Sequence, residues 1–272
     1  MLAAAGFRTS RLVATALLLL AMGISSNVLV LAAIRFFAGL ASAFVMVFTS
    51  AIVLSHGLAA KKPWVQSSHF GGVGTGISLS AVMFGLIILA DSGWRMAWIM
   101  AAVLAFAGLA VVLRYLPRDV VRVGPAKKEP PLVWTPALTA LTIAYGIFGF
   151  GYIVTATFLV AIVRDGGGSS LFEAGVWLAT GLAAAPSVAY WMPAVRRVGL
   201  ANVFALGCLV EALGVAASVL MPLPAGPIIG GVLLGSTFIM VTAFGLQLGR
   251  QLAPESPRRA LALMTAAFGT GQ

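Results

Sequence analysis

The chain has 272 residues, of which 61% are hydrophobic and 9% are charged, against about 45–50% and about 25% in soluble domains. This composition excludes a water-soluble fold. The net charge of +10 lies in short segments between apolar runs, as membrane orientation signals do, and no basic surface interleaved with aromatic residues predicts nucleic-acid binding.

The first predicted elements are two helices within the apolar stretch 12–55. A bilayer core of about 30 Å needs roughly 20 residues per crossing, so this stretch must turn back, and we expect the turn at 23–27 (GISSN). The runs are apolar on every face, which excludes a β-barrel, because barrel strands alternate apolar and polar residues. Further helices are expected at 68–90, 94–114, 136–163, 171–194, 200–221 and 225–249, and from 257 to the last residue, where the ninth is cut short.

Capping residues predict where several helices start. Thr135-Pro136 and Ser256-Pro257 each place a hydroxyl before a proline at the first helical position. Ser170 with Glu173 has the spacing of a capping box, in which each side chain bonds to the backbone of the other residue.

The charges predict the orientation of the helices. If loops alternate between sides, 14 of the 17 lysines and arginines fall on one side, which we expect to be the cytoplasmic side of a bacterial inner membrane. The charged, proline-rich segment 114–135 is then a cytoplasmic linker. At the outer side, Asp165 lies beside Arg164, which predicts a solvated pair.

An internal repeat is visible in two places. The segment 42–47 (SAFVMV) resembles 236–241 (STFIMV), 194 residues later, and the Gly-Thr-Gly at 74–76 recurs at 269–271, 195 residues later. Two matches at nearly one offset predict a parallel duplication.

The duplication predicts a parent protein of six plus six helices. The offset leaves room for two helices before Met1 and for further chain beyond Gln272. We therefore expect 1–113 to be the N-terminal half (helices three to six), 114–135 the linker, and 136–272 the C-terminal half (helices seven to ten and part of eleven).

Two parallel six-helix repeats joined by a basic linker are the plan of the major facilitator superfamily. Arg35 and Gly39, in AAIRFFAGLASAF, resemble its fourth-helix motif, and MPAVRRVGLANV at 192–203 resembles its basic loop motif. The chain is similar to the YbfB-like branch of that superfamily at 69–81, 145–159 and 261–272.

The resemblance implies an all-α integral membrane bundle with two pseudo-twofold-related halves, here truncated. It implies a secondary transporter that moves a small molecule by alternating access, with protons as a candidate coupling ion and no cofactor. We expect the parent to transport and the 272-residue chain alone not to. A channel is an alternative, although no filter-like loop or charged ring is present.

A membrane-embedded enzyme is the other alternative. It would need a nucleophile with a base, or clustered carboxylates, at membrane depth. His56 and His69 both flank a cytoplasmic loop, and Cys208 is the only cysteine. The sequence therefore predicts neither catalysis nor a metal site.

Two helical stripes superpose under the 194-residue offset. They are Arg35, Ser42, Met46 and Thr49 in the first half, and Ser236, Met240 and Gln247 in the second. Because helices four and ten line the central cavity in the superfamily, the resemblance implies that these residues are substrate walls. Close packing of small residues is the alternative.

Three features suggest specific roles in transport. Arg35 lies roughly 12 Å past the turn, where a cation is costly unless paired or wetted; it holds an anionic substrate group, takes part in proton coupling, or snorkels to the outer interface. Glu211, mid-helix, is a proton relay or makes a structural hydrogen bond. Tyr145 and Tyr152 share a glycine-rich helix face that lines the cavity or simply packs.

Overall fold

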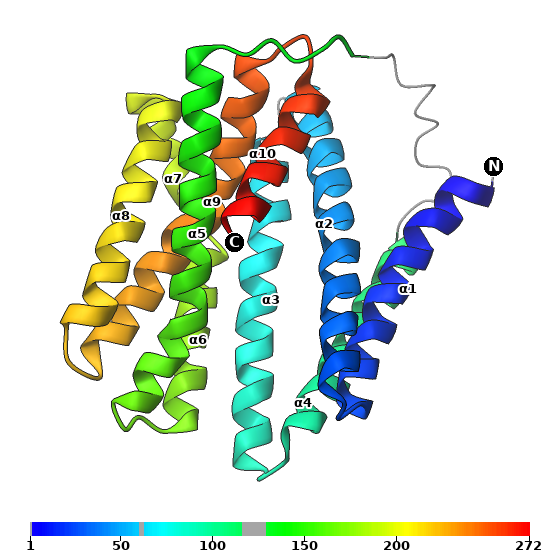
Figure 1. Cartoon of the computed structure of the whole chain (residues 1–272), viewed down its shortest axis with the longest axis vertical. Helices are drawn as coiled ribbons and strands as arrows, with labels where there is room; N and C mark the ends of the chain where they lie inside the picture. Colours follow the sequence, from blue (N-terminus) through cyan, green and yellow to red (C-terminus); the bar gives the residue numbers. More distant parts are fainter. Residues whose placement is uncertain (1, 60–62, 116–128) are drawn as a thin grey trace. The chain divides into compact units, whose positions relative to one another are not determined.

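The computed structural model describes residues 2–59, 63–115 and 129–272, which form ten α-helices (Figure 1). They are α1 (Leu2–Ile24), α2 (Val28–Ala59), α3 (Pro63–Leu89), α4 (Trp94–Tyr115), α5 (Pro136–Asp165), α6 (Ser170–Ala184), α7 (Ser187–Val198), α8 (Leu200–Leu220), α9 (Ala225–Leu252) and α10 (Pro257–Gly271). Within these helices, side chains are described except at 2–12, 43–44, 46–48, 51–52, 54–59 and 63.

The predicted turn in the first apolar stretch is confirmed. α1 ends at Ile24 and α2 begins at Val28. Asn27 Oδ1 accepts hydrogen bonds from the backbone nitrogens of Leu29 and Val30, at 2.9 and 3.3 Å. An asparagine at this position satisfies backbone donors that the first turn of a helix leaves unpaired.

The prediction of one helix over 171–194 is wrong. α6 ends at Ala184 and α7 begins at Ser187, with a bend of 43° between them. Pro186 has no N–H to continue the helical ladder, and the Ser187 hydroxyl donates to the Ala184 carbonyl, at 2.8 Å, across the break.

The predicted starts at Thr135-Pro136 and Ser256-Pro257 are confirmed, because α5 begins at Pro136 and α10 at Pro257. The predicted side-chain caps are confirmed only at α5. Thr135 Oγ1 accepts from Leu138 N, at 3.2 Å, at the start of α5. The cap of α6 is Ser169, not Ser170, and it accepts from Phe172 N at 3.2 Å.

At α10, Ser256 makes no side-chain cap; its hydroxyl donates instead to the carbonyl of Pro130, at 2.9 Å.

Glu173 forms an ion pair in place of the predicted capping box. Arg164 donates from Nε to Glu173 Oε1 at 3.0 Å and from Nη2 to Oε2 at 3.1 Å. The predicted pairing of Arg164 with Asp165 is wrong, because the guanidinium turns to α6 instead.

The chain divides into two compact units. One comprises Met1–Thr49 and Leu86–Lys128, and the other Ser50–Gly85 and Glu129–Gln272. α2 and α3 each pass from one unit to the other. The expected halves 1–113 and 136–272 remain a prediction, since most of the linker between them lies outside the described residues.

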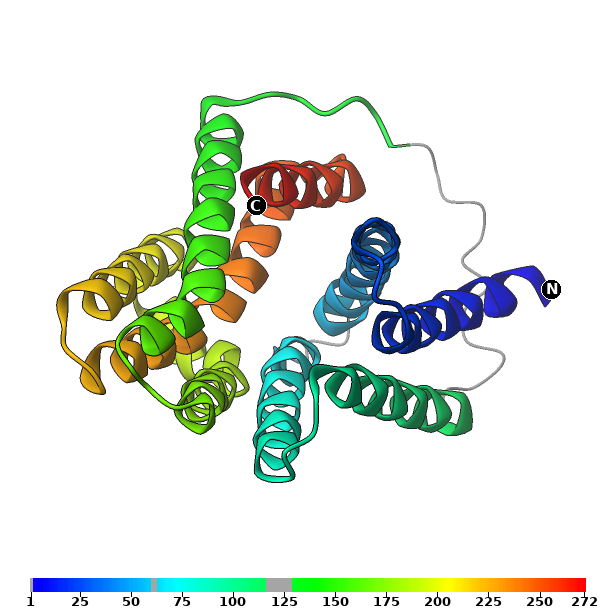
Figure 2. The same ribbon diagram turned by 60° about the horizontal axis from the view of Figure 1, so that its bottom comes forward.

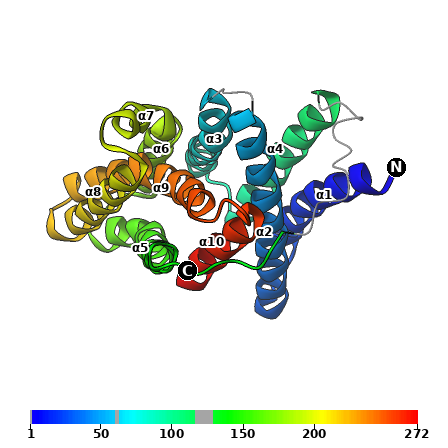
Figure 3. The same cartoon turned by 90° about the horizontal axis from the view of Figure 1, so that it is seen from above.

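In the first unit, α1 packs along α4 (Figure 3). A Cβ on Gly23 would lie 3.0 Å from Ile99 Cγ1 and 3.3 Å from Trp98 Cβ, so the end of α1 sits directly on α4. Arg95 donates to the Ser26 hydroxyl, which joins the turn after α1 to the first turn of α4.

In the second unit, α9 is the central helix, and two thirds (67%) of its apolar 18-residue stretch is buried. It packs against α8 and α6 (Figure 2). Gly235 faces the carbonyl of Thr180 so closely that a methyl group there would clash with it. Small residues at such contacts let helices approach closely, as is typical of membrane bundles.

Five helices of the described residues are long and apolar enough to cross a membrane, and six if α6 and α7 form one bent span. They are α3, α4, α5, α8 and α9.

Candidate functional site

An aromatic cluster lies inside the second unit, where α5, α8, α9 and α10 meet. Its rings belong to Tyr145, Phe148, Tyr152, Phe204, Phe238 and Phe268. Tyr152 is stacked between two of them, with its ring centroid 5.1 Å from that of Phe238 and 5.8 Å from that of Phe268. The cluster thus ties α5 to both α9 and α10.

Tyr145 is the most enclosed member of this aromatic cluster, at 1% exposure. Its hydroxyl donates to the carbonyl of Thr242 on α9, at 3.2 Å. A buried phenol normally finds such a partner, because an unpaired hydroxyl in an apolar setting is costly.

A glycine on α5 brings α10 into the cluster. A Cβ on Gly149 would lie 2.6 Å from the carbonyl oxygen of Phe268, closer than real Cβ contacts allow. The absence of a side chain here therefore sets the distance between the two helices and places the Phe268 ring against Tyr145 and Tyr152.

Glu211 lies on the buried face of α8. α5 and α8 run in the same direction (Figure 1), and the rings of Tyr145 and Phe204 are neighbours, 6.4 Å apart. Seven residues further along each helix, about 10 Å, come Tyr152 and Glu211. Glu211 is therefore level with Tyr152.

The contacts between α8 and α9 agree with this level. Gly207 lies against Met240, and Gly214 lies against Leu233. Glu211, between the two glycines, therefore falls opposite residues 236–237, beside the stacked pair of Tyr152 and Phe238.

One oxygen of the Glu211 carboxyl lacks a hydrogen-bond partner. Glu211 is 4% exposed, and its Oε2 atom is buried without a hydrogen bond. Native structures rarely leave a buried polar atom unsatisfied, and those that do call for a specific explanation. A carboxyl so enclosed, with one oxygen unpaired, is a candidate for binding and releasing a proton.

The sequence model of a family described as "Uncharacterised MFS-type transporter YbfB" matches residues 4–272. The chain belongs to this family of major facilitator transporters. It is therefore a multi-pass membrane protein of the transporter class, as the resemblance predicted. No curated protein matches the chain.

Of the second stripe expected for a YbfB-family cavity, Met240 is fully buried and lies against Gly207 of α8. Ser236 and Gln247 are partly buried. The carbonyl of Ser236 accepts from the indole nitrogen of Trp191 on α7, at 2.9 Å. Of the predicted site residues in this unit, Tyr145, Tyr152 and Glu211 gather at the aromatic cluster.

The first stripe belongs to the other unit. Arg35 and Ser42 are exposed there, and the guanidinium of Arg35 lies over the ring of Trp98, 5.7 Å from its centroid. The Thr49 hydroxyl donates to the carbonyl of Val45, at 2.6 Å. The side chain of Met46 lies outside the described residues.

Sequence reasoning missed most of the rings. Phe238 and Phe268 stand in apolar helices where phenylalanine is ordinary, so neither carries a signal of its own. Phe268 does fall in a segment that resembles the YbfB-like branch, 261–272, but that resemblance gives no contact. Only the pairing of helices reveals that these rings enclose Tyr152.

Proposed function

We propose that the protein is a secondary active transporter that moves a small molecule across the bacterial inner membrane by alternating access, coupled to protons through Glu211. The observation that carries the coupling is the buried Oε2 atom of Glu211, which has no hydrogen-bond partner. In a family of transporters, an enclosed carboxyl in a membrane helix is a functional candidate by default.

The proton step needs only groups at the aromatic cluster. The Glu211 carboxylate takes up a proton when water reaches it from one side of the membrane and releases it when access changes to the other. Tyr152, level with Glu211 and only partly buried, supplies a hydroxyl through which that proton passes. The stacked ring of Phe268 covers Tyr152 and limits the entry of water.

The substrate pathway is proposed along the predicted stripes. Ser236 and Gln247 are the members of the second stripe that remain partly accessible within their unit. Ser42 on α2 is the proposed counterpart of Ser236 under the 194-residue offset, and Thr49 belongs to the same first stripe. Cytoplasmic placement of the linker 114–135 completes the proposed topology.

Counterflow in proteoliposomes tests transport. Radiolabelled sugars, amino acids and organic acids are screened with the protein produced as residues 1–272 and with any coding sequence that flanks them. Exchange that saturates with solute concentration supports a transporter. Flux that rises linearly and shows no exchange indicates a pore and overturns alternating access.

Glu211→Gln tests the coupling, because glutamine keeps the shape of the side chain but cannot lose a proton. We expect exchange to persist while uphill, proton-driven uptake falls to background. Glu255→Gln, at an exposed acid between α9 and α10, is the matched control and should leave both unchanged. Proton-driven uptake that survives in Glu211→Gln would remove this residue from the mechanism.

A further inference from the structure

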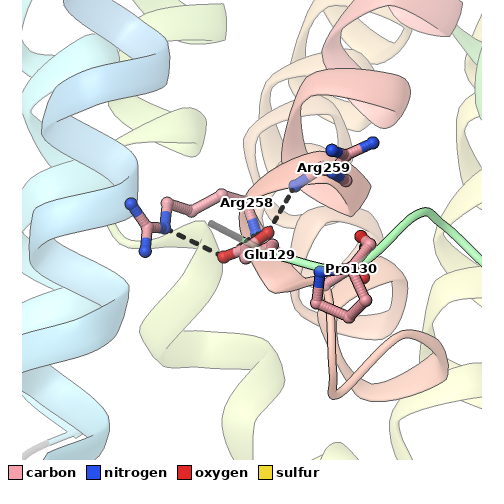
Figure 4. Close-up of polar contacts among 5 residues, drawn as sticks. Glu129, Pro130, Arg258 and Arg259 are labelled. Carbon is pink, nitrogen blue, oxygen red and sulfur yellow. Dashed lines mark hydrogen bonds and ion pairs between the residues drawn. The ribbon is translucent and has the colours of Figure 1, made fainter. Parts of the chain in front are cut away.

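The last part of the linker is fastened to the start of α10 by a carboxylate (Figure 4). Glu129 accepts hydrogen bonds from Arg258 Nε at 2.9 Å, from Arg258 N at 3.1 Å and from Arg259 N at 3.2 Å. Its side chain is only 13% exposed. Glu129 thus supplies the anion that the first turn of a helix favours.

Three arginines lie near this one carboxylate. Arg250 is in the last turn of α9, and Arg258 and Arg259 are in the first turn of α10. We name these three residues the arginine cluster. Glu129 balances one of their three charges, and Figure 4 shows the side chain of Arg259 directed away from it. Among these four side chains, positive charges therefore outnumber negative ones by two.

One side-chain nitrogen of Arg250 lacks a hydrogen-bond acceptor. Its Nη1 atom is buried and has no hydrogen-bond partner, although Glu129 is near enough to act on it electrostatically. A guanidinium nitrogen withdrawn from water and left unpaired is costly. An acceptor group from outside the chain would satisfy it.

The arginine cluster lies where lipid headgroups are expected. The apolar span of α9 ends at Leu252, two residues past Arg250. Trp134, just before α5 and five residues from Glu129, is 58% exposed. Tryptophan and arginine at the ends of membrane helices are typical of the interface, where the phosphates of the bilayer lie.

We propose that the arginine cluster binds the phosphate group of an anionic membrane lipid, with Arg250 as its principal donor. The planar fork of a guanidinium matches two phosphate oxygens at once. Basic pockets between helices at the cytoplasmic face bind such headgroups in other membrane proteins. Glu129 sets the strength of the site, because it competes with the lipid for the same charges.

Native mass spectrometry of the purified protein with added phosphatidylglycerol tests this site. Arg250→Gln should lower the retained phosphatidylglycerol by about tenfold, the effect of losing one strong charge-assisted hydrogen bond. Arg196→Gln removes an exposed arginine from the last turn of α7 and should leave retention unchanged. Equal retention in Arg250→Gln and the parent overturns the proposal, as does an equal loss in Arg196→Gln.

Glu129→Gln should change the retention of phosphatidylglycerol in the direction opposite to Arg250→Gln. Glutamine keeps an oxygen that accepts from the N–H groups of Arg258 and Arg259, so the start of α10 is preserved, while the cluster gains one net charge. Retention of phosphatidylglycerol should rise, a result that damage to the fold would not give; a fall would contradict the competition.

Two further measurements, one with an uncharged lipid and one with a soluble anion, identify the ligand. Phosphatidylcholine, whose headgroup has no net charge, should be retained weakly and equally by all variants. Inorganic phosphate at the same concentration as phosphatidylglycerol should not displace it. Displacement at that concentration would mean that the site takes a soluble anion, and the assignment to lipid would be overturned.

Discussion

Arg164 and Glu173 join the end of α5 to the first turn of α6 through two parallel hydrogen bonds, of 3.0 and 3.1 Å. The two side chains differ in their surroundings: that of Arg164 is 68% exposed and that of Glu173 is 5% exposed. The arginine therefore reaches over the helix end to neutralise a carboxylate that the protein encloses. Such a geometry is stronger than an ordinary surface pair.

Glu173→Gln should therefore lower the free energy of unfolding by about 1–2 kcal/mol, since one charge-assisted bond is lost and exposed Arg164 regains water. The unfolding midpoint of the purified protein in detergent measures the change. Asp165→Asn, one residue from the arginine but outside the pair, should stay within about 0.5 kcal/mol of the parent. Equal effects of the two substitutions would mean that general charge, and not this pair, matters.

Neighbouring serines distinguish the observed start of α6 from the predicted one. Ser169→Ala removes the hydroxyl that accepts from Phe172 N and should cost about 1 kcal/mol. Ser170→Ala removes a hydroxyl from the first helical residue and should cost at most about 0.3 kcal/mol. The same midpoint measurement ranks the two variants, and the reverse order would place the cap at Ser170.

Glycines on α3 offer a second matched pair. A methyl group on Gly74 would clash with the backbone nitrogen of Ala185, at the break between α6 and α7, whereas one on Gly72 would meet nothing within 4 Å. Backbone cannot move aside as a side chain can, so Gly74→Ala should destabilise by about 2 kcal/mol or more. Gly72→Ala should stabilise the helix by about 0.5–1 kcal/mol. Denaturant or thermal unfolding in detergent measures both, and a neutral Gly74→Ala would contradict the close contact.

The positions of the helices were largely predictable from sequence, because the bilayer fixes the length of each apolar run. The break at Pro186 was missed for the same reason. Residues 171–194 have the total apolar length of one span, and that length outweighed the proline within it. The cap of α6 was misplaced by one residue because Ser169 and Ser170 carry the same chemistry, and only the hydrogen bond to Phe172 separates them.

The candidate site was predictable in its polar members only. Tyr152 and Glu211 each stand out in an apolar helix, but their common level depends on how α5 and α8 are aligned, which no local pattern encodes. The contact of Glu129 with Arg258 spans 129 residues of sequence. Pairing at such a distance depends on the whole bundle and leaves no periodic signal.

Tyr145 provides a test of the aromatic cluster itself. Tyr145→Phe keeps the ring against Phe204 and Phe268 but removes the hydroxyl that donates to the Thr242 carbonyl. Because that carbonyl is then left without this donor in an apolar interior, the free energy of unfolding should fall by about 1 kcal/mol.

Tyr190→Phe, at a tyrosine that is 75% exposed, is the control and should change the unfolding midpoint little. Tyr145→Leu should cost more than Tyr145→Phe, about 2–4 kcal/mol, because it also opens a cavity among the rings. If Tyr145→Phe and Tyr190→Phe were indistinguishable, the bond between α5 and α9 would contribute nothing, and packing of the rings alone would hold these helices together.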